Sequence, residues 1–195
     1  PILAARWIEG RAQPVWSDPE TLTPCLFAQG GAMACRRDLY LALGGFDPVF
    51  APGYWEDYDL CWRAARAGFE ILYEPRAIAF HIGGGSMRRR YGEKEVWRLR
   101  ARNHLLFEWL NLSDPGRLAS HAAWIARHVA REWLRGEGFG YTRVLARALG
   151  RLPAALRSRF ARARRLRALL PPGEAPAPES RLFQIGRGFH SSATP

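Results

Sequence analysis

The sequence predicts an α/β domain followed by basic α-helices. Between residues 28 and 81, short apolar runs bounded by glycine or proline alternate with a helical pattern. After residue 90, apolar residues recur at helical spacing among many arginines. The charge divides in the same way, because residues 1–85 hold seven Arg and ten acidic residues, whereas residues 86–195 hold 22 Lys or Arg and eight acidic residues.

The α/β part begins without a clear pattern. Residues 1–27 contain several prolines and are expected to be irregular. "AQGGAMACRR" (residues 28–37) has the small and apolar residues of a buried strand. Asp38 is placed to cap a short helix, "LYLAL", and Gly44 is placed to end it.

A second helix and two strands follow. Residues 55–67 are expected to form a helix, because Leu60 and Ala64 fall on one face and Gly68 follows as a stop signal. "FEILYE" is a strand that Pro75 should close, and "AIAFH" is another short apolar strand.

The basic part is helical. Apolar residues mark a helix over residues 94–112, and "SDP" starts the next one, with Pro115 in its first turn and Gly136 at its end. A third helical stretch covers residues 141–169 with an interruption near Pro153.

Composition favours a folded protein with reduced thiols. The chain has 195 residues, 48% of them hydrophobic, which is enough for an ordinary core. No run of about 18 uncharged apolar residues occurs, so no transmembrane helix is predicted, and the start "PILAARWIEG" does not resemble a signal peptide. Cys25, Cys35 and Cys61 lack CxxC spacing, which is typical of buried thiols in a cytosolic protein.

The stretch "YWEDYDLC" (residues 54–61) crowds Glu56, Asp57 and Asp59 into the start of a helix. Acidic residues there interact favourably with the helix dipole, by about 0.3–1 kcal/mol each. Repulsion among three carboxylates makes this a poor account of the whole cluster, and a general base at the edge of a cleft is the functional alternative. A metal site of DxD type is disfavoured, because residues i and i+2 of a helix point in nearly opposite directions.

Two further features are candidates for a site. His81 ends a strand and precedes three glycines, so it is either a structural histidine or a metal ligand beside a close-approach loop. Arg102 and Asn103 interrupt the apolar stripe of their helix. They are either at the edge of the core or directed towards the site and the loop over it.

The stretch from residue 143 to residue 167 has nine Arg and no acidic residue. Nucleic acid, anionic lipid and water are all possible partners for it. Its mixture of Leu and Phe with Arg at helical spacing favours a helix on a membrane surface, and it lacks the interleaved aromatics of a single-strand binder.

Taken together, residues 28–112 resemble the C-terminal half of the catalytic domain of family 2 inverting glycosyltransferases, in the rhamnosyltransferase-like subgroup of bacterial polysaccharide and O-antigen synthesis. The resemblance rests on "GGAMACRRDLYLALGGFDPVFAPGYWEDYDLCWRAARAGFEILYEPRAIAFHIGGGS", whose motifs follow one another in the family's order and spacing. It implies a GT-A fold, which is a Rossmann-like nucleotide-sugar domain with a mixed sheet.

The resemblance also implies roles for single residues. Asp57 would be the general base, Glu56 would help to position the acceptor, and Trp55 would offer it a stacking face. The resemblance gives Asp59 no role, and its expected contribution is the electrostatics of the helix start alone, since it points away from Asp57. His81 would be one ligand of Mg²⁺ or Mn²⁺.

Four more residues carry over by the same resemblance. Gly30 and Gly31 would line the acceptor side of the cleft. Arg102 and Asn103 match an Arg-Asn pair of the family, although the tyrosine that usually precedes this pair is replaced here by Trp97 or Arg98.

The N-terminal half of the family's domain, which holds the nucleobase and the other metal ligands, has no counterpart in this sequence. We therefore expect four parts: a lead-in from an absent N-terminal half at residues 1–27, the C-terminal half of a GT-A domain at residues 28–112, a basic helical extension at residues 113–170, and a disordered tail at residues 171–195.

The expected partners are a nucleotide-sugar donor, a saccharide or lipid-linked acceptor, and the anionic inner face of the cell membrane, on which the protein would be cytoplasmic and peripheral. Nucleic acid is not expected. The alternatives are a non-enzymatic module that binds nucleic acid through its basic helices and a non-catalytic assembly partner.

Overall fold

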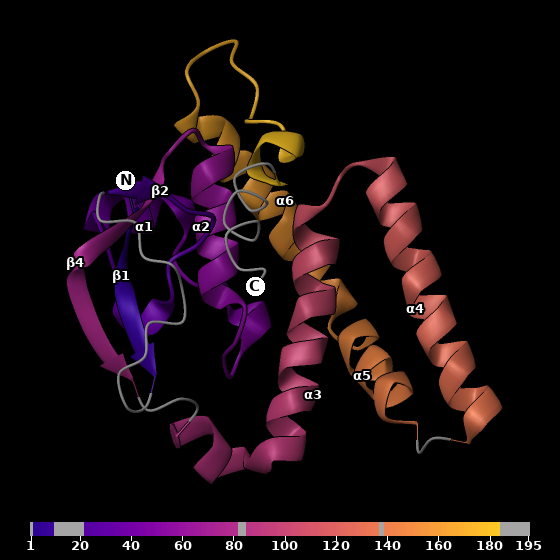
Figure 1. The fold of residues 1–195 in the computed structure, drawn as a ribbon. Coiled ribbons are helices and arrows are strands. Elements are labelled where there is room, and N and C mark those ends of the chain that lie inside the picture. Colours follow the sequence, from indigo (N-terminus) through magenta and orange to yellow (C-terminus); the bar gives the residue numbers. More distant parts are fainter. Residues whose placement is uncertain (1, 10–21, 82–84, 137–138, 184–195) are drawn as a thin grey trace. The chain divides into compact units, whose positions relative to one another are not determined.

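The computed structural model describes residues 2–9, 22–81, 85–136 and 139–183, without the side chains of residues 5–9 and 81 (Figure 1). The chain divides into two compact units, which are considered separately below. Unit 1 consists of Pro1–Asp47, Glu56–Gly85 and Ala161–Pro195, and unit 2 consists of Pro48–Trp55 and Ser86–Phe160.

Unit 1 is built on a mixed four-stranded sheet. Its strands are β1 (Ile2–Glu9), β2 (Thr23–Pro24), β3 (Met33–Cys35) and β4 (Ile71–His81), in the order β2-β4-β1-β3. β1 runs parallel to β4 and antiparallel to β3, and β2 is antiparallel to β4. The expected α/β fold class is confirmed, and the sheet is compatible with part of a Rossmann-like glycosyltransferase domain.

The expectation of an irregular start is wrong for residues 2–9, because β1 is an interior strand of this sheet, and residues 10–21 of that stretch lie outside the described residues. Ile2 and Ala4 face the core and are buried, whereas Leu3 lies on the opposite face. This alternation is too short to stand out in the sequence, and the pairing partners of β1 lie about 30 and 70 residues further along the chain.

β4 is a single strand, although two strands separated by Pro75 were expected. Its register shifts where Ala5 pairs with Glu74 and Arg6 pairs with Ile78, so that residues 75–77 form a bulge. A bulge accommodates the missing amide hydrogen of proline without ending the strand.

Residues 28–37 form less strand than expected. A 3₁₀ turn, η1 (Gly30–Ala32), comes first and only the three residues of β3 follow. The next helix, α1 (Arg37–Leu43), ends at Gly44 in a left-handed conformation (φ 88°), as expected. Asp38 lies inside the first turn and pairs with Arg36, so it is not the N-cap.

Helix α2 (Glu56–Arg66) matches its expected range and presents the acidic cluster at its start. Figure 1 shows α2 beside the strands of unit 1. The core between α1, α2 and the sheet contains Ile2, Leu39, Leu43, Leu60 and Ile71 among its buried residues.

Part of the expected disordered tail is packed against α2. The Ala177 amide donates to the Arg66 carbonyl oxygen at 3.0 Å, and Glu179 pairs with the Arg66 guanidinium. Leu182 is 1% exposed. Apolar residues and one acid among the prolines thus hold this segment as far as residue 183, and the rest of the tail lies outside the described residues.

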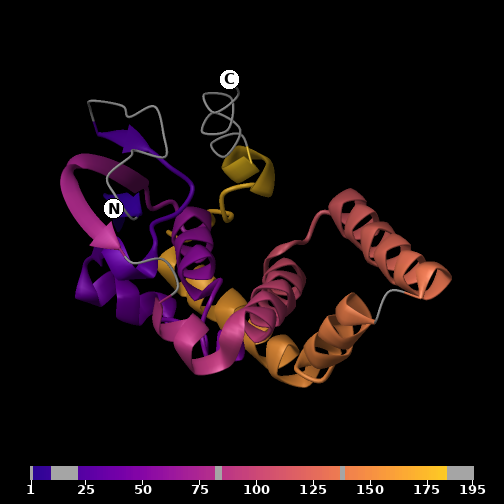
Figure 2. The ribbon, with the colours of Figure 1, turned by 60° about the horizontal axis from the view of Figure 1, so that its bottom comes forward.

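Four helices complete the chain: α3 (Gly85–Asn111), α4 (Pro115–Arg135), α5 (Gly140–Leu149) and α6 (Leu152–Leu169). The Asp114 side chain caps α4, and Gly136 (φ 65°) ends it. Within unit 2, α3, α4 and α5 share a core in which Leu105, Tyr141 and Val144 are buried (Figure 2). No helix in the part of the chain that the structure describes is long and apolar enough to cross a membrane.

Candidate active site

Asp57 occupies the first turn of α2 and is partly exposed. One of its carboxylate oxygens accepts a hydrogen bond from the Gly30 amide at 3.0 Å, and the other accepts one from the Tyr58 amide at 2.8 Å. A Cβ built on Gly30 would lie 3.6 Å from the Asp57 Cβ, so the loop and the helix are in close contact. Two of the predicted site residues are therefore brought together, and the carboxylate is held in one orientation with lone pairs left for a substrate hydroxyl.

Glu56, the neighbouring carboxylate, has a different environment. Its Oε2 atom is buried and has no hydrogen-bond partner among the described residues. Burial raises the pKa of Glu56, and the charge of Asp57 adds to this rise. Such an unsatisfied polar group destabilises the fold, and a functional role is one of the explanations for keeping it.

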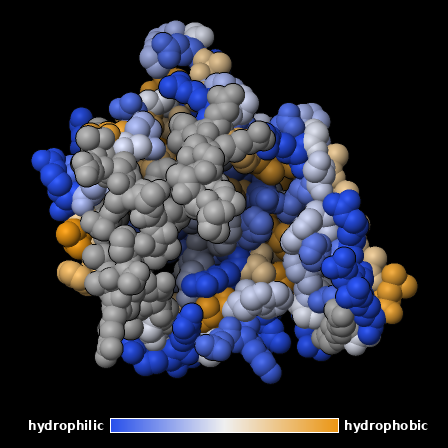
Figure 3. All heavy atoms as spheres, in the orientation of Figure 1, coloured by the Kyte–Doolittle hydropathy of each residue, from blue (hydrophilic) through white to orange (hydrophobic). Residues whose placement is uncertain are grey.

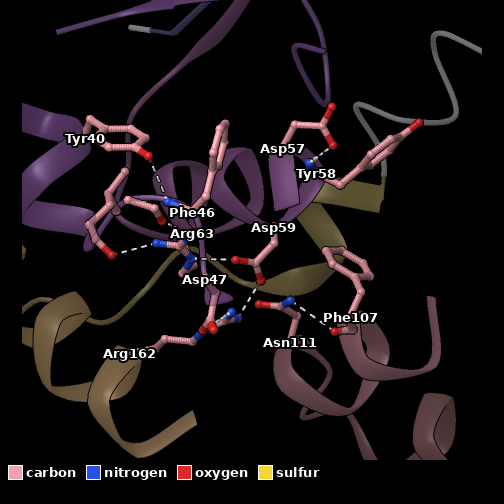
Figure 4. Close-up of polar contacts among 12 residues, drawn as sticks. Tyr40, Phe46, Asp47, Asp57, Tyr58, Asp59, Arg63, Phe107, Asn111 and Arg162 are labelled. Atoms are coloured by element: carbon pink, nitrogen blue, oxygen red, sulfur yellow. Dashed lines mark hydrogen bonds and ion pairs between the residues drawn. The ribbon is translucent and has the colours of Figure 1, made fainter. Parts of the chain in front are cut away.

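Asp59 is fully buried and has a structural role (Figure 4). Its carboxylate accepts from the Arg63 Nε at 2.9 Å and also from Arg162. Arg162 pairs in addition with Asp47, with 2.6 Å between its Nη2 and the Asp47 Oδ2.

The Arg63 guanidinium also donates to the Leu43 and Gly45 carbonyl oxygens, at 2.6 and 2.7 Å. Asp59 was expected to contribute only to the electrostatics of the helix start, and it is instead the centre of a buried ion-pair network. Asp57 and Asp59 have separate sets of partners, in agreement with the expectation that they point in different directions (Figure 4).

In unit 2, the segment that leads into α2 has an unusual backbone. Tyr54 and Trp55 both have positive φ values, 74° and 76°. This conformation is costly for aromatic residues and persists only where the surroundings impose it. The Trp55 indole stacks on the His104 imidazole with 4.5 Å between ring centroids, so one of its faces is already covered. The Phe107 ring also lies against the indole, with 5.1 Å between ring centroids, so the expectation that Trp55 offers the acceptor a stacking face stays a prediction.

Asn103 imposes this backbone conformation. Its side-chain nitrogen lies 2.7 Å from the Phe50 carbonyl oxygen and 2.8 Å from those of Gly53 and Tyr54. Asn103 is fully buried, so these contacts replace water as the partner of three backbone groups.

Arg102 supports the same segment. Its guanidinium donates to the Asn103 side-chain oxygen at 2.8 Å and to the Ala51 carbonyl oxygen at 2.7 Å. Burial, together with the nearby charges of Arg151 and Arg147, lowers the pKa of Arg102 to about 10. Of the alternatives open for the pair, the structure supports binding of the loop and shows no edge-of-core arginine extended into water.

The predicted metal ligand lies at the end of β4, where the His81 backbone pairs with Glu9. Its side chain, Ile82, Gly83 and Gly84 lie outside the described residues. No group of three or more His, Cys, Asp or Glu residues within the described ranges is arranged to hold a metal ion. The prediction that His81 is a ligand of a divalent cation therefore stays a prediction.

Three residues that take part in these contacts were not predicted from the sequence. Asp47 and Arg162 are separated by 115 residues, and no local pattern connects them. His104 follows the Arg-Asn pair directly, and the aromatic character of both His104 and Trp55 was the one available signal that they stack.

Comparison with known proteins gives partial similarity to glycosyltransferases. Over 55 residues the chain is 40% identical to proteins named "Pre-mycofactocin glycosyltransferase" from two strains of Mycobacterium tuberculosis. Over 88 residues it is 31% identical to a Drosophila melanogaster protein named "Putative polypeptide N-acetylgalactosaminyltransferase 10". No family model and no solved structure matches the chain significantly.

The matched stretches are short on both sides. They cover 28% of this chain and 11% of each mycobacterial relative, and 42% of this chain and 14% of the Drosophila protein. These similarities support a glycosyltransferase at the level of the general class. They do not distinguish the rhamnosyltransferase-like subgroup.

Proposed function

We propose that this chain carries the acceptor side of the active site of an inverting glycosyltransferase, with Asp57 as the general base. The observation that carries the proposal is the carboxylate of Asp57, which is partly exposed at the start of α2 and oriented by the Gly30 amide at 3.0 Å. The partial similarity to glycosyltransferases supports the reaction class.

In the proposed reaction, Asp57 accepts the proton of an acceptor hydroxyl as that oxygen forms a bond to the anomeric carbon of the donor sugar. The bond from this carbon to the diphosphate oxygen breaks on the opposite face, and its electron pair leaves with the diphosphate. One displacement therefore inverts the configuration. Carboxylate bases of this kind contribute about 10²–10⁴-fold to a rate.

The neighbouring residues position the acceptor. The buried, unpartnered Oε2 of Glu56 is available to an acceptor hydroxyl. The role of Trp55 in stacking on the acceptor rests on the family resemblance, and the Arg102–Asn103 pair holds the segment that carries Trp55. Gly31 follows Gly30 in the turn η1 and is part of the same proposed acceptor wall.

The donor and the cation come from the family resemblance. We propose a nucleotide-sugar donor and a saccharide or lipid-linked acceptor of cell-surface polysaccharide synthesis at the inner face of the membrane. Mg²⁺ or Mn²⁺, with His81 as one ligand and further ligands outside this chain, would neutralise charge on the leaving diphosphate.

A transfer assay tests the proposal. The protein that contains this chain is incubated with a panel of nucleotide sugars and saccharide acceptors, while release of nucleoside diphosphate is followed. We expect acceptor-dependent release, and NMR of the product should show an anomeric configuration opposite to that of the donor. A product with retained configuration would contradict the proposed single displacement.

Binding of nucleic acid by the basic helices is less well supported. Arg151 and Arg159 donate to backbone carbonyl oxygens of unit 2, and Arg162 pairs with carboxylates of unit 1. Part of the basic charge of residues 143–167 is therefore engaged within the protein. Filter binding at low salt distinguishes the two functions, because phosphate contacts make binding strongest there.

A further inference from the structure

The end of α4 and the start of α5 carry an unusual set of exposed apolar side chains in unit 2. We call this set the α4–α5 corner, and it consists of Trp97, Trp133, Leu134 and Phe139. Their exposed fractions are 52%, 62%, 87% and 37%. Figure 3 shows hydrophobic residues, in orange, among hydrophilic ones where α4 ends. Single exposed apolar residues are ordinary, but a group that includes two tryptophans indicates an interaction site.

The four side chains belong to one local structure. The Trp133 and Phe139 rings make an edge contact with 4.9 Å between their centroids. A Cβ built on Gly140, the residue after Phe139, would lie 4.0 Å from the Trp97 ring. The corner therefore joins residues of α3, α4 and the α4–α5 connection.

Hydrogen bonds fix the corner in place. The Glu132 carboxylate accepts from the Thr142 amide at 2.8 Å and from the Thr142 hydroxyl at 2.9 Å, and it also accepts from the Tyr141 amide. This carboxylate caps the start of α5, where the helix dipole favours negative charge. These bonds join the last turn of α4, which carries Trp133 and Leu134, to the first turn of α5.

The charge around the corner is mostly positive. Arg127, Arg131, Arg135 and Arg143 are all exposed. The acidic residues nearby in sequence are Glu132, which is engaged in the cap, Glu95, which pairs with Arg98 and Arg147, the exposed Glu93, and Glu137, which lies outside the described residues. Four more exposed residues of α4 are alanines, namely Ala122, Ala123, Ala126 and Ala130.

We propose that the α4–α5 corner inserts into the headgroup region of an anionic lipid bilayer. Trp, Leu and Phe beside Arg are the residues that lie at a membrane interface, where the rings reach the acyl boundary and the guanidinium groups bind lipid phosphates. This surface replaces residues 143–167 as the expected membrane contact. Insertion of the corner into a bilayer does not require sugar transfer, so either proposal can be refuted without refuting the other.

Vesicle sedimentation tests the proposal with the 195-residue chain. The wild type should sediment with vesicles of phosphatidylcholine and phosphatidylglycerol, and less with phosphatidylcholine alone. Trp133→Ser combined with Leu134→Ser should weaken binding by about tenfold or more, because two interfacial apolar groups are lost. Phe160→Ser is the matched control, because Phe160 is 73% exposed but lies on α6, outside the corner. This variant should bind vesicles like the wild type.

A second double variant tests the charged residues separately from the apolar ones. Arg127→Glu combined with Arg131→Glu should abolish the preference for phosphatidylglycerol, and circular dichroism should show that all variants keep their helices. Wild-type binding by both double variants would overturn the proposal, and so would failure of the wild type to bind anionic vesicles. A dimer that does not bind vesicles and that Trp133→Ser/Leu134→Ser dissociates would identify a second copy as the occupant instead.

Discussion

At the scale of single residues, the two adjacent carboxylates at the start of α2 differ in their partners. Asp57 accepts hydrogen bonds from the Gly30 and Tyr58 amides, whereas the buried Oε2 of Glu56 has no partner among the described residues. Glu56 therefore reduces the stability of the fold, as residues retained for function commonly do.

The first prediction is that Glu56→Gln stabilises the chain at pH 7. Because the pKa of Glu56 is raised on folding, the folded state binds this proton more tightly than the unfolded state. Wild-type stability is thus lost as the pH rises from the ordinary glutamate range through the raised pKa. The neutral amide avoids this cost, and we expect a melting temperature higher by about 2–4 °C, which corresponds to roughly 1 kcal/mol in a chain of this size.

Thermal unfolding at two pH values checks this prediction. Below pH 4 both side chains are neutral, so the difference between the variant and the wild type should vanish. An equal stabilisation at both pH values would attribute the effect to packing and not to the charge. A lower melting temperature at pH 7 would show that Glu56 has a stabilising partner.

At the scale of elements, the segment before α2 depends on α3. Tyr54 and Trp55 have positive φ values, and Asn103 contacts three carbonyl oxygens of this segment. These contacts fix the backbone of residues 50–54, which belong to unit 2 like Asn103 itself.

The second prediction is that Asn103→Leu lowers the free energy of unfolding by about 2–4 kcal/mol, because buried carbonyl groups lose their donor. Hydrogen exchange should increase selectively in residues 50–55. Asn111→Leu is the control on the same helix, since its amide donates to the Phe107 carbonyl oxygen one turn earlier and its loss should cost about 1 kcal/mol. Equal effects of the two variants would contradict the role of Asn103.

Helix α6 contributes long-range ion pairs to unit 1. Its residue Arg162 pairs with two carboxylates, Asp47 and Asp59, of which Asp59 is fully buried. Removing one partner from a buried ion-pair network leaves uncompensated charge.

The third prediction is that Arg162→Met lowers the free energy of unfolding by about 3–5 kcal/mol in denaturant titrations. Arg164→Met, at an exposed position of the same helix, should change it by no more than about 0.5 kcal/mol. If the two substitutions had similar effects, the network would be dispensable and residues 143–167 could be a surface helix as first expected.

At the scale of the whole molecule, sequence analysis was successful where the signal is local. The helix over residues 56–66 and its stop at Gly68 follow from spacing and a glycine, and so does the helix that begins at Pro115 and ends before Gly136. Residue pairs far apart in the chain carry no such signal. β1 was missed because its strand partners are distant, and the tail to residue 183 was missed because proline-rich composition concealed its contacts with α2.

The candidate site was predicted in the same uneven way. Asp57 and Gly30 were both predicted site residues, and the Gly30 amide donates to the Asp57 carboxylate. Arg102 and Asn103 hold a strained loop, and this role could not be predicted because it depends on carbonyl groups that lie 49 to 53 residues away in the sequence. The role of Asp59 required Arg162, which lies 103 residues further along.

The central claim, that Asp57 is the base of a sugar transfer, is tested most directly by Asp57→Asn in the protein that contains this chain. Turnover and donor binding are measured together, with Asp38→Asn as a control, since Asp38 is exposed on α1 and paired with Arg36. We predict that Asp57→Asn reduces turnover by about 10²–10⁴-fold with donor affinity changed by no more than about threefold, while Asp38→Asn behaves like the wild type. Undiminished turnover by Asp57→Asn would contradict the account.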